Sequence, residues 1–207
     1  MSEYKWEDSG EERSHPYLLN TINSIFNKKK FNFNNTDLLD LGCGNGYLTK
    51  KISDLNNFKS IKAIDTSAQG ISYAKNNYNG IIKFYHKSID DLILSGEKYN
   101  FVTCFEVIEH VYNPDLFLKN IVKIIHDDGH ILISTPFHGY IKNLLISLLN
   151  NFDHHFDPLW MHGHIKFFSK KTFKIIANRN NLHIVDIYYS GRVYPISKSM
   201  FILLKKI

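Results

Sequence analysis

Apolar runs alternate with helix-like stretches along most of this chain. The runs contain few polar residues, which is typical of strands that helices cover on both faces. We expect such strands at 36–41, 59–64, 81–86, 99–105 and 130–135. Helices are predicted between them at 46–55, 67–78 and 114–126. This alternation predicts an α/β fold with a parallel sheet and helices on both faces.

The two ends of the chain have different patterns. Residues 1–13 are polar, and residues 14–29 have helical spacing, with Ser14 as a cap and Pro16 in the first turn. After Pro136 we expect helices at 139–150 and 169–180, strands at 182–190 and 199–206, and an irregular segment at 151–168. We interpret 1–207 as one domain with an N-terminal arm and helix (1–30) and a substrate or lid insert (137–168).

A glycine turn after the first predicted strand is the most informative motif. Asp40 precedes Gly42, Gly44 and Gly46, which are spaced G-x-G-x-G. A dinucleotide fold usually carries G-x-G-x-x-G, so the third glycine comes one residue early. A carboxylate at Asp40 suits the ammonium group of an amino acid. This favours a nucleoside bearing an amino acid, with a NAD-dependent oxidoreductase or a non-catalytic binding module as the alternatives.

The segment D-L-G-C-G-N-G resembles the first motif of class I S-adenosylmethionine-dependent methyltransferases. Later segments resemble that family's other motifs in order, at 63–67, 88–91, 101–111 and 128–136. The resemblance implies a Rossmann-like, mostly parallel seven-stranded sheet with an antiparallel C-terminal edge pair, and S-adenosylmethionine as donor. It also implies the cofactor-binding residues Asp40, Gly42, Cys43, Gly44, Gly46, Asp65, Thr66, Ile89, Asp90 and Phe105.

Within the fourth motif, E-V-I-E-H-V is similar to the same stretch in the ubiquinone-biosynthesis O-methyltransferases. That resemblance implies a divalent metal on Glu106, Glu109 and His110. On a helix these three positions would share one face, and the donor set suits Mg²⁺, Mn²⁺ or Zn²⁺. The alternative is that the glutamates complement a helix N-terminus while His110 lines the pocket.

The segment 153–164 contains four histidines and two aspartates. Such a tract is compatible with metal binding, but its spacing matches no standard zinc pattern, and we favour a substrate lid. His164 resembles a residue near the acceptor site of the ubiquinone enzymes. His110 or His164 is our candidate general base, because imidazole titrates near neutrality. Tyr4, Trp6 and Tyr17 are candidates for a second lid over the cofactor.

Composition limits the remaining choices. The net charge of +5 lies largely in short lysine runs, which usually mark a solvated face, and no nucleic-acid module is visible. Two cysteines without a C-x-x-C pattern favour a reducing cytoplasm, and the apolar run 144–149 is too short to span a bilayer. We therefore expect a cytoplasmic monomer or homodimer that methylates a small molecule on oxygen. N- or C-methylation of an amine, sugar or macromolecule is the alternative.

Overall fold

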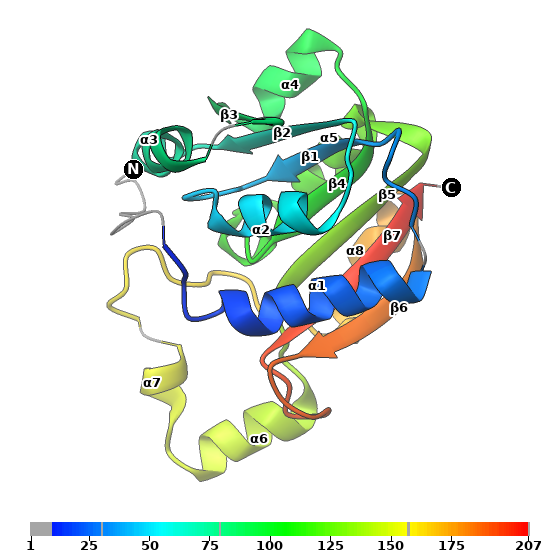
Figure 1. The fold of residues 1–207 in the computed structure, drawn as a ribbon. Helices are drawn as coiled ribbons and strands as arrows, with labels where there is room; N and C mark the ends of the chain where they lie inside the picture. Colours follow the sequence, from blue (N-terminus) through cyan, green and yellow to red (C-terminus); the bar gives the residue numbers. More distant parts are fainter. Residues whose placement is uncertain (1–9, 30, 79, 157, 207) are drawn as a thin grey trace.

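The computed structural model describes residues 10–29, 31–78, 80–156 and 158–206 (Figure 1). Within these residues a seven-stranded sheet has the order β3-β2-β1-β4-β5-β7-β6. The strands are β1 (Asp37–Leu41), β2 (Ser60–Asp65), β3 (Ile82–His86), β4 (Tyr99–Phe105), β5 (Ile125–Pro136), β6 (Leu182–Ser190) and β7 (Ser199–Lys206). Strands β1 to β5 pair in parallel, and β7 is antiparallel to both β5 and β6. The predicted sheet and its antiparallel edge pair are confirmed.

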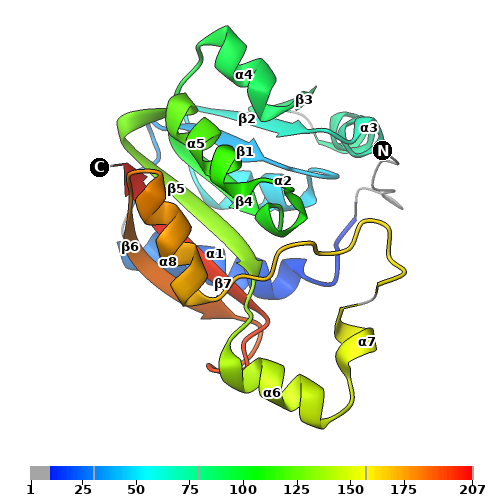
Figure 2. The same cartoon turned by 180° about the vertical axis from the view of Figure 1, so that it is seen from behind.

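Helices cover both faces of this sheet (Figures 1 and 2). They are α1 (His15–Lys29), α2 (Tyr47–Leu55), α3 (Ala68–Asn77), α4 (Ile89–Ser95), α5 (Pro114–Ile124), α6 (Tyr140–Leu148), α7 (Phe152–His155) and α8 (Lys170–Arg179), with the 3₁₀ helix η1 (Ile108–His110). One hydrophobic core joins the sheet to α1, α2 and α3, and the other joins it to α4, α5 and α8. Because both faces are buried, the central strands are apolar throughout.

Three predicted elements differ from the structure. The segment after β3, for which the apolar pattern predicts no helix, forms helix α4, which Ser88 and Asp91 cap reciprocally in a capping box. Helix α5 ends at Ile124 rather than at 126, because the chain enters β5 directly. The irregular segment 151–168 contains the short helix α7. In each case local hydrogen bonds decide the structure, and the spacing of apolar residues does not reveal such bonds.

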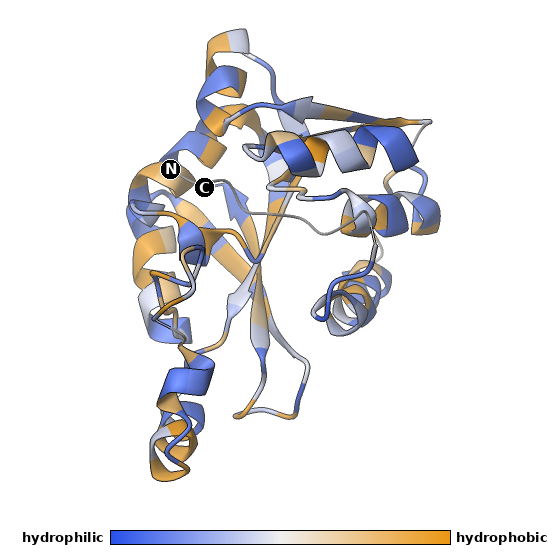
Figure 3. Cartoon of the chain, turned by 90° about the vertical axis from the view of Figure 1, so that its left-hand side faces the viewer, coloured by the Kyte–Doolittle hydropathy of each residue, from blue (hydrophilic) through white to orange (hydrophobic). Residues whose placement is uncertain are grey.

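The insert between β5 and α8 projects from the body of the domain (Figures 1 and 3). Its helix α6 buries only Lys142 and Ile146, and exposes apolar side chains such as Leu144, Leu145 and Leu148. Neither hydrophobic core contains a described residue of α6 or α7. In the part of the chain that the structure describes, no helix is long and apolar enough to cross a membrane.

Candidate active site

The glycine turn connects the end of β1 to the start of α2. Gly42, Gly44 and Gly46 have φ of 79°, 54° and 80°, values that side chains with a Cβ rarely adopt. A Cβ on Gly42 would lie 2.4 Å from Val107, and one on Gly46 would lie 2.7 Å from Ala74. Two of the three glycines are therefore required by both backbone and space, and the turn presents the N-terminus of α2 at the carboxyl edge of the sheet.

Asp40 lies beneath this turn rather than on its surface. Its side chain is 3% exposed, and its two oxygens accept hydrogen bonds from the hydroxyls of Thr49 and Thr103. Burial raises the pKa of Asp40 to about 6, although these two hydrogen bonds act in the opposite direction. The carboxylate therefore fixes β1 against α2 and β4. Its predicted contact with an ammonium group stays a prediction.

Asp65 ends β2 and lies at the same edge of the sheet. Its Oδ2 accepts from the amide of Gly44 and its Oδ1 from the amide of Ser67, both at 2.7 Å. Burial raises the pKa of this carboxyl, and the amide hydrogen bonds oppose that effect. The neighbouring Thr66 is exposed, and its carbonyl lies 3.0 Å from Nε2 of His86. Asp65 thus joins the second strand to the glycine turn.

Four further residues that the sequence predicts to bind the methyl donor lie around this edge. Ile89 and Asp90 begin α4, where Ile89 is buried and Asp90 accepts a hydrogen bond from Asn120 at 2.9 Å. Cys43 is buried within the turn, and Phe105 ends β4 with its ring centroid 5.8 Å from that of Phe201. The structure therefore brings β1, β2, β4 and the start of α4 to one edge, as the motifs predict.

The glutamates of the fourth motif do not share a helix face, and that prediction is wrong. Glu106 precedes η1 and has a left-handed backbone with φ of 52°, a strain that non-glycine residues keep mainly at functional sites. Its oxygens accept hydrogen bonds from the hydroxyls of Ser134 at 2.7 Å and Ser199 at 3.3 Å. Burial raises the pKa of Glu106 to about 7.

Glu109 is fully buried, and one of its oxygens is unsatisfied. Oε2 accepts from Thr135 at 3.0 Å, whereas Oε1 has no hydrogen-bond partner among the described residues. That free oxygen lies 4.0 Å from Nε2 of His110. Burial raises the pKa of Glu109 well above its usual value. A buried carboxylate oxygen without a partner is costly, so it marks a place for a cation or a donor group.

The sequence-predicted base candidates meet at this point. The rings of His110 and His164 are 4.9 Å apart between centroids, and both amides of Ile165 and Lys166 donate to the carbonyl of Glu109 at 2.9 Å. Ligand atoms of Glu109, His110 and His164 lie within 4.8 Å of one another. The structure thus brings His164, rather than Glu106, to the pair that the fourth motif supplies.

Lys142 is a buried lysine whose charge acts on Glu106, and the sequence did not reveal it. It is 8% exposed, and its ammonium donates to the carbonyls of Phe137 at 2.8 Å and Lys198 at 3.3 Å. Burial lowers its pKa to about 8, and the neighbouring charge of Arg192 also lowers it. The only available signal was that Lys142 is the single charged residue in the apolar stretch 140–149.

A second group of missed residues covers the glycine turn from the N-terminal side. Asn45 donates from Nδ2 to the carbonyl of Gly10 at 3.0 Å, and the ring of His15 stacks on Tyr47 at 5.1 Å. The segment before α1 is thereby held against the start of α2. Tyr4 and Trp6, predicted as part of a lid, lie outside the described residues.

Comparisons with known proteins agree with this geometry. A family model for the methyltransferase domain matches residues 11–187, so the chain belongs to that family. The ubiquinone biosynthesis O-methyltransferase of Rickettsia bellii is 28% identical over 204 residues, which cover 96% of this chain and 83% of that protein. The mitochondrial enzyme of the same name from Schizosaccharomyces pombe is 28% identical over 175 residues, and the match spans 82% of this chain but 62% of the yeast protein.

Solved structures share the fold at low identity. An S-adenosylmethionine-dependent methyltransferase from Clostridium acetobutylicum superposes with a TM-score of 0.69 at 13% identity, covering 93% of this chain and 92% of the other. Magnesium protoporphyrin IX methyltransferase from Synechocystis, solved with S-adenosylhomocysteine, gives 0.69 at 14% identity and covers 92% and 82%. The predicted class, a class I S-adenosylmethionine-dependent methyltransferase similar to the ubiquinone-biosynthesis group, is confirmed.

Proposed function

We propose that this enzyme transfers the methyl group of S-adenosylmethionine to a hydroxyl oxygen of a small molecule. The relatives with matches over most of this chain are named as O-methyltransferases. The observation that carries the proposal is the joining of Asp65 to the amide of Gly44 at 2.7 Å, beside a turn built from left-handed glycines. It leaves a carboxylate and a helix N-terminus facing one edge of the sheet, where ligands of such folds bind.

In this proposal the donor lies across the ends of β1 and β2. Asp65 accepts hydrogen bonds from the ribose hydroxyls, because an ionised carboxylate has about four lone-pair sites and the two amides occupy only part of that capacity. Ile89 packs on the adenine and Asp90 lies at its amino group. Gly42, Gly44 and Gly46 let the backbone approach the amino-acid end, with Cys43, Thr66 and Phe105 around it.

The role that we propose for Asp40 differs from the direct contact with an ammonium group that the glycine motif suggested. Because both of its oxygens accept from hydroxyls beneath the turn, we propose that it acts on the donor's amino-acid end through the position of the turn and through its negative field. Because Asp40 is buried, Thr49 or Thr103 would have to move before its carboxylate could contact the ammonium group directly.

Methyl transfer from a sulfonium is an in-line displacement: the acceptor oxygen attacks the methyl carbon and the carbon–sulfur bond breaks. The protein must align the two atoms and take the hydroxyl proton. We propose His164 or His110 as the base. Burial lowers the pKa of His164 to about 4 and that of His110 below its usual value, although backbone hydrogen bonds at Gly163 and His162 oppose this for His110. Both rings are therefore neutral at pH 7, the form in which an imidazole can take a proton.

As an alternative to a histidine base, we propose that these rings help to hold a divalent metal, because a nitrogen lone pair that binds a metal is not available to take a proton. The free oxygen of the buried Glu109 and the nitrogens of His110 and His164 fit a cation, since their ligand atoms lie within 4.8 Å of one another. Glu106, the third ligand expected from the sequence, would have to leave Ser134 and Ser199 to join them. When bound, such an ion would lower the pKa of an acceptor hydroxyl.

The acceptor is proposed to bind under the insert 137–168, whose 160–166 segment packs on η1. Trp160 lies over both candidate bases, with ring centroids 6.1 Å from His110 and 5.7 Å from His164. An aromatic ring at this place suits a flat organic acceptor. A cytoplasmic location and a monomeric or homodimeric state stay predictions.

The proposal is tested by incubating the protein with methyl-labelled S-adenosylmethionine and a small-molecule metabolite extract. Mass spectrometry then identifies the compound that gains the label. We expect the label on a former hydroxyl oxygen, as a methyl ether. Label on nitrogen or carbon would contradict O-methylation, and label only on protein or nucleic acid would contradict a small-molecule acceptor.

A further inference from the structure

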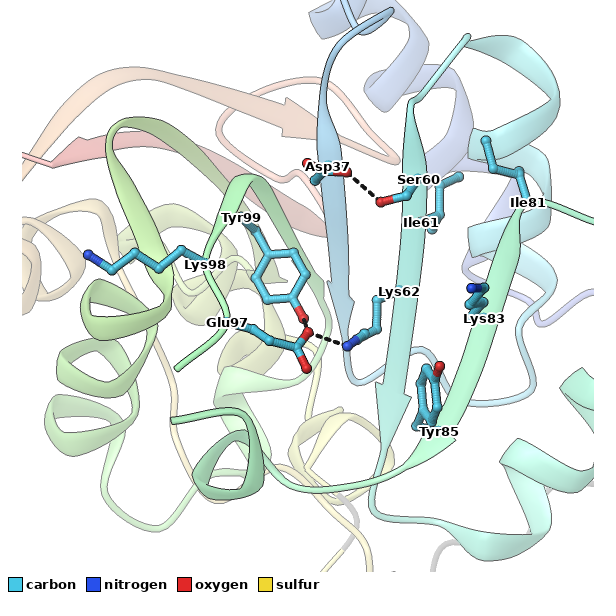
Figure 4. A pocket seen from close by; sticks show the side chains of 10 residues that line it. All are labelled: Asp37, Ser60, Ile61, Lys62, Ile81, Lys83, Tyr85, Glu97, Lys98 and Tyr99. Carbon is cyan, nitrogen blue, oxygen red and sulfur yellow. Dashed lines mark hydrogen bonds and ion pairs between the residues drawn. The ribbon is translucent and has the colours of Figure 1, made fainter. Parts of the chain in front are cut away.

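A cavity lies away from the proposed donor site. It has a volume of about 370 Å³ and lies beside the edge strand β3, on the sheet face that α4 and α5 cover (Figure 4). It reaches Asp37 and Ser60, the first residues of β1 and β2, whereas the glycine turn follows the last residue of β1. Its volume falls within the range of roughly 300–1,000 Å³ that small-molecule sites occupy.

The cavity exists because α4 is short. This helix has seven residues, ends at Gly96 with φ of 68°, and buries only Ile89 and Leu92. The chain returns to β4 at once through Glu97 and Lys98. The neighbouring part of β2 and β3 is therefore left without a covering helix, and Ile81 is 44% exposed there.

A hydrogen-bonded network forms one wall of the cavity. Glu97 accepts a hydrogen bond from the hydroxyl of Tyr99 at 2.7 Å and pairs with the ammonium of Lys62. The same ammonium lies 5.2 Å from the ring centroid of Tyr85. The Lys62 and Tyr99 hydrogen bonds hold the pKa of Glu97 below its usual value. Because Tyr99 is buried, this wall is a fixed part of the fold rather than a set of mobile surface side chains.

The charges around the cavity favour an anion. Its two carboxylates are already matched: Glu97 by Lys62, and Asp37 by Lys59 at 3.0 Å. Lys83 and Lys98 also line the cavity, and neither forms an ion pair within 4.0 Å with a described residue. Two unmatched ammonium groups suit a dianion, and phosphate oxygens accept strong charge-assisted hydrogen bonds from lysine.

Figure 4 shows Lys83 and Tyr85 next to each other on β3, and Lys62 extending from β2 towards Glu97 on the side away from β3. Lys98 extends away from Tyr99 in this view, and its flexible four-carbon stem lets it turn across the opening. Lys87 adds a further positive charge, 5.6 Å from the ring of Tyr85. A ligand that bound here would thus meet cations at the rim and the aromatic ring of Tyr85 next to Lys83.

We propose that this cavity is a second ligand site that binds a small organic phosphate. Its phosphate group pairs with the ammonium of Lys83, and its organic part contacts the ring of Tyr85, two residues along the same strand. Lys98 adds positive charge from the opposite side of the cavity. The site is independent of methyl transfer, since none of these residues belongs to the proposed donor or acceptor sites.

Isothermal calorimetry with phenyl phosphate, at about 0.15 M salt to screen surface charge, tests the proposal on the full chain. We expect binding to the unmodified protein and at least tenfold weaker binding to the double variant Lys83→Gln, Lys98→Gln. The matched control is Lys75→Gln, which removes an exposed lysine of α3 that does not line the cavity. Its affinity for phenyl phosphate is expected to be unchanged.

Two further titrations show whether the phosphate group, the organic group or both are needed for binding. Inorganic phosphate is expected to bind more weakly than phenyl phosphate, and neutral benzyl alcohol not at all. Equal affinity for inorganic and phenyl phosphate would contradict an organic ligand. The proposal is overturned if phenyl phosphate does not bind, if the double variant binds it as well as the unmodified protein, or if Lys75→Gln weakens it equally. Because all three lysines are exposed, unchanged urea unfolding midpoints will verify that the variants are folded.

Discussion

The carboxylate of Asp65 accepts a hydrogen bond from the backbone amide of Gly44 at 2.7 Å. This bond joins the end of β2 to the turn after β1, across residues 21 positions apart. The amide of Ser67 fixes the other oxygen of the same carboxylate at the start of α3. The proposed ribose acceptor is therefore held in place before any donor arrives, which reduces the entropy cost of binding.

Replacing Asp65 with Asn tests that role. An amide keeps one acceptor oxygen and places an NH₂ group where Asp65 accepts hydrogen bonds, so a donor–donor conflict arises at Gly44 or at the ribose. We expect at least about tenfold weaker binding of S-adenosylhomocysteine, equivalent to about 1.4 kcal/mol. Asp54→Asn, at an exposed position of α2, is the control and should bind normally. Equal affinities in the two variants would refute a direct role for Asp65.

Gly46 and Gly96 form a matched pair for the glycine turn. Both have left-handed backbones, with φ of 80° and 68°. A Cβ on Gly46 would lie 2.7 Å from Ala74 and 2.9 Å from Phe84, whereas a Cβ on Gly96 would meet nothing within 4 Å. We expect Gly96→Ala to lower the free energy of unfolding by about 1 kcal/mol. Gly46→Ala should lower it by roughly 1–3 kcal/mol more, because the core must move.

Urea unfolding measures both variants under the same conditions. The comparison removes the backbone cost that the two positions share and leaves the steric part. If Gly46→Ala is no less stable than Gly96→Ala, the close packing of the turn against α3 and β3 is not present in solution.

His164 and His154 separate a catalytic from a structural histidine within the same insert. His164 lies against His110, whereas His154 is exposed on α7. If His164 takes the acceptor proton, His164→Gln should lower kcat by about 100-fold or more while leaving the affinity for S-adenosylhomocysteine unchanged. His154→Gln should leave both quantities unchanged. Normal turnover by His164→Gln would exclude His164 as the base and leave His110 as the candidate.

Glu109 and Glu106 are expected to differ in their effect on metal binding. Elemental analysis after dialysis against Zn²⁺ or Mn²⁺ should find a bound ion in the unmodified protein and in Glu106→Gln, because Glu106 is engaged by Ser134 and Ser199. Glu109→Gln should lose the ion, since it removes the free buried oxygen next to His110. Equal loss in both variants would restore the ligand set expected from the sequence, and a fully active metal-free protein would end the metal proposal.

Stability should fall in mild acid, in part because of His15. Burial lowers the pKa of His15 to about 4 from the ordinary 6.5, although the charge of Glu11 opposes this. Between these two values the unfolded chain binds a proton that the folded chain does not, so the free energy of unfolding decreases as pH falls from about 6.5 to about 4. The loss from this one group amounts to at most about 3 kcal/mol.

Replacing His15 with Phe should keep the ring that stacks on Tyr47 and remove this part of the acid sensitivity. Urea unfolding at pH 7 and at pH 5 measures the difference for each protein. His183→Phe, at an exposed position of β6, is the control and should keep the pH dependence of the unmodified chain. An unchanged pH dependence in His15→Phe would show that burial of the His15 ring does not contribute.

The parts of this fold that the sequence predicts are those whose signals are local. Each central strand is a continuous apolar run. The turn after β1 is predictable from its three glycines, which have positive φ in the structure. Helix α4 has no such signal, because seven residues are too few for an apolar periodicity. The local sign of this helix is its capping box at Ser88 and Asp91. The type of an element is thus predictable where its pattern is long or its backbone requires glycine.

The candidate site is less predictable because its contacts are non-local. Lys142 bonds to the carbonyl of Lys198, 56 residues away, and His164 reaches His110 only after the insert has folded back on η1. Glu106 adopts a left-handed backbone, which the presence of a glutamate in the sequence does not predict. The family resemblance therefore placed Glu106 among the candidate metal ligands, whereas the folded chain brings His164 next to Glu109 and His110.

The most direct test of the whole account is calorimetric titration of the folded protein with S-adenosylhomocysteine, with NADH as the comparison ligand. We predict a single saturating heat signal with S-adenosylhomocysteine, lost or weakened in Asp65→Asn, and no saturating signal with NADH. No binding of S-adenosylhomocysteine by protein that unfolds cooperatively in urea, or equal binding of NADH, would contradict the proposed donor site.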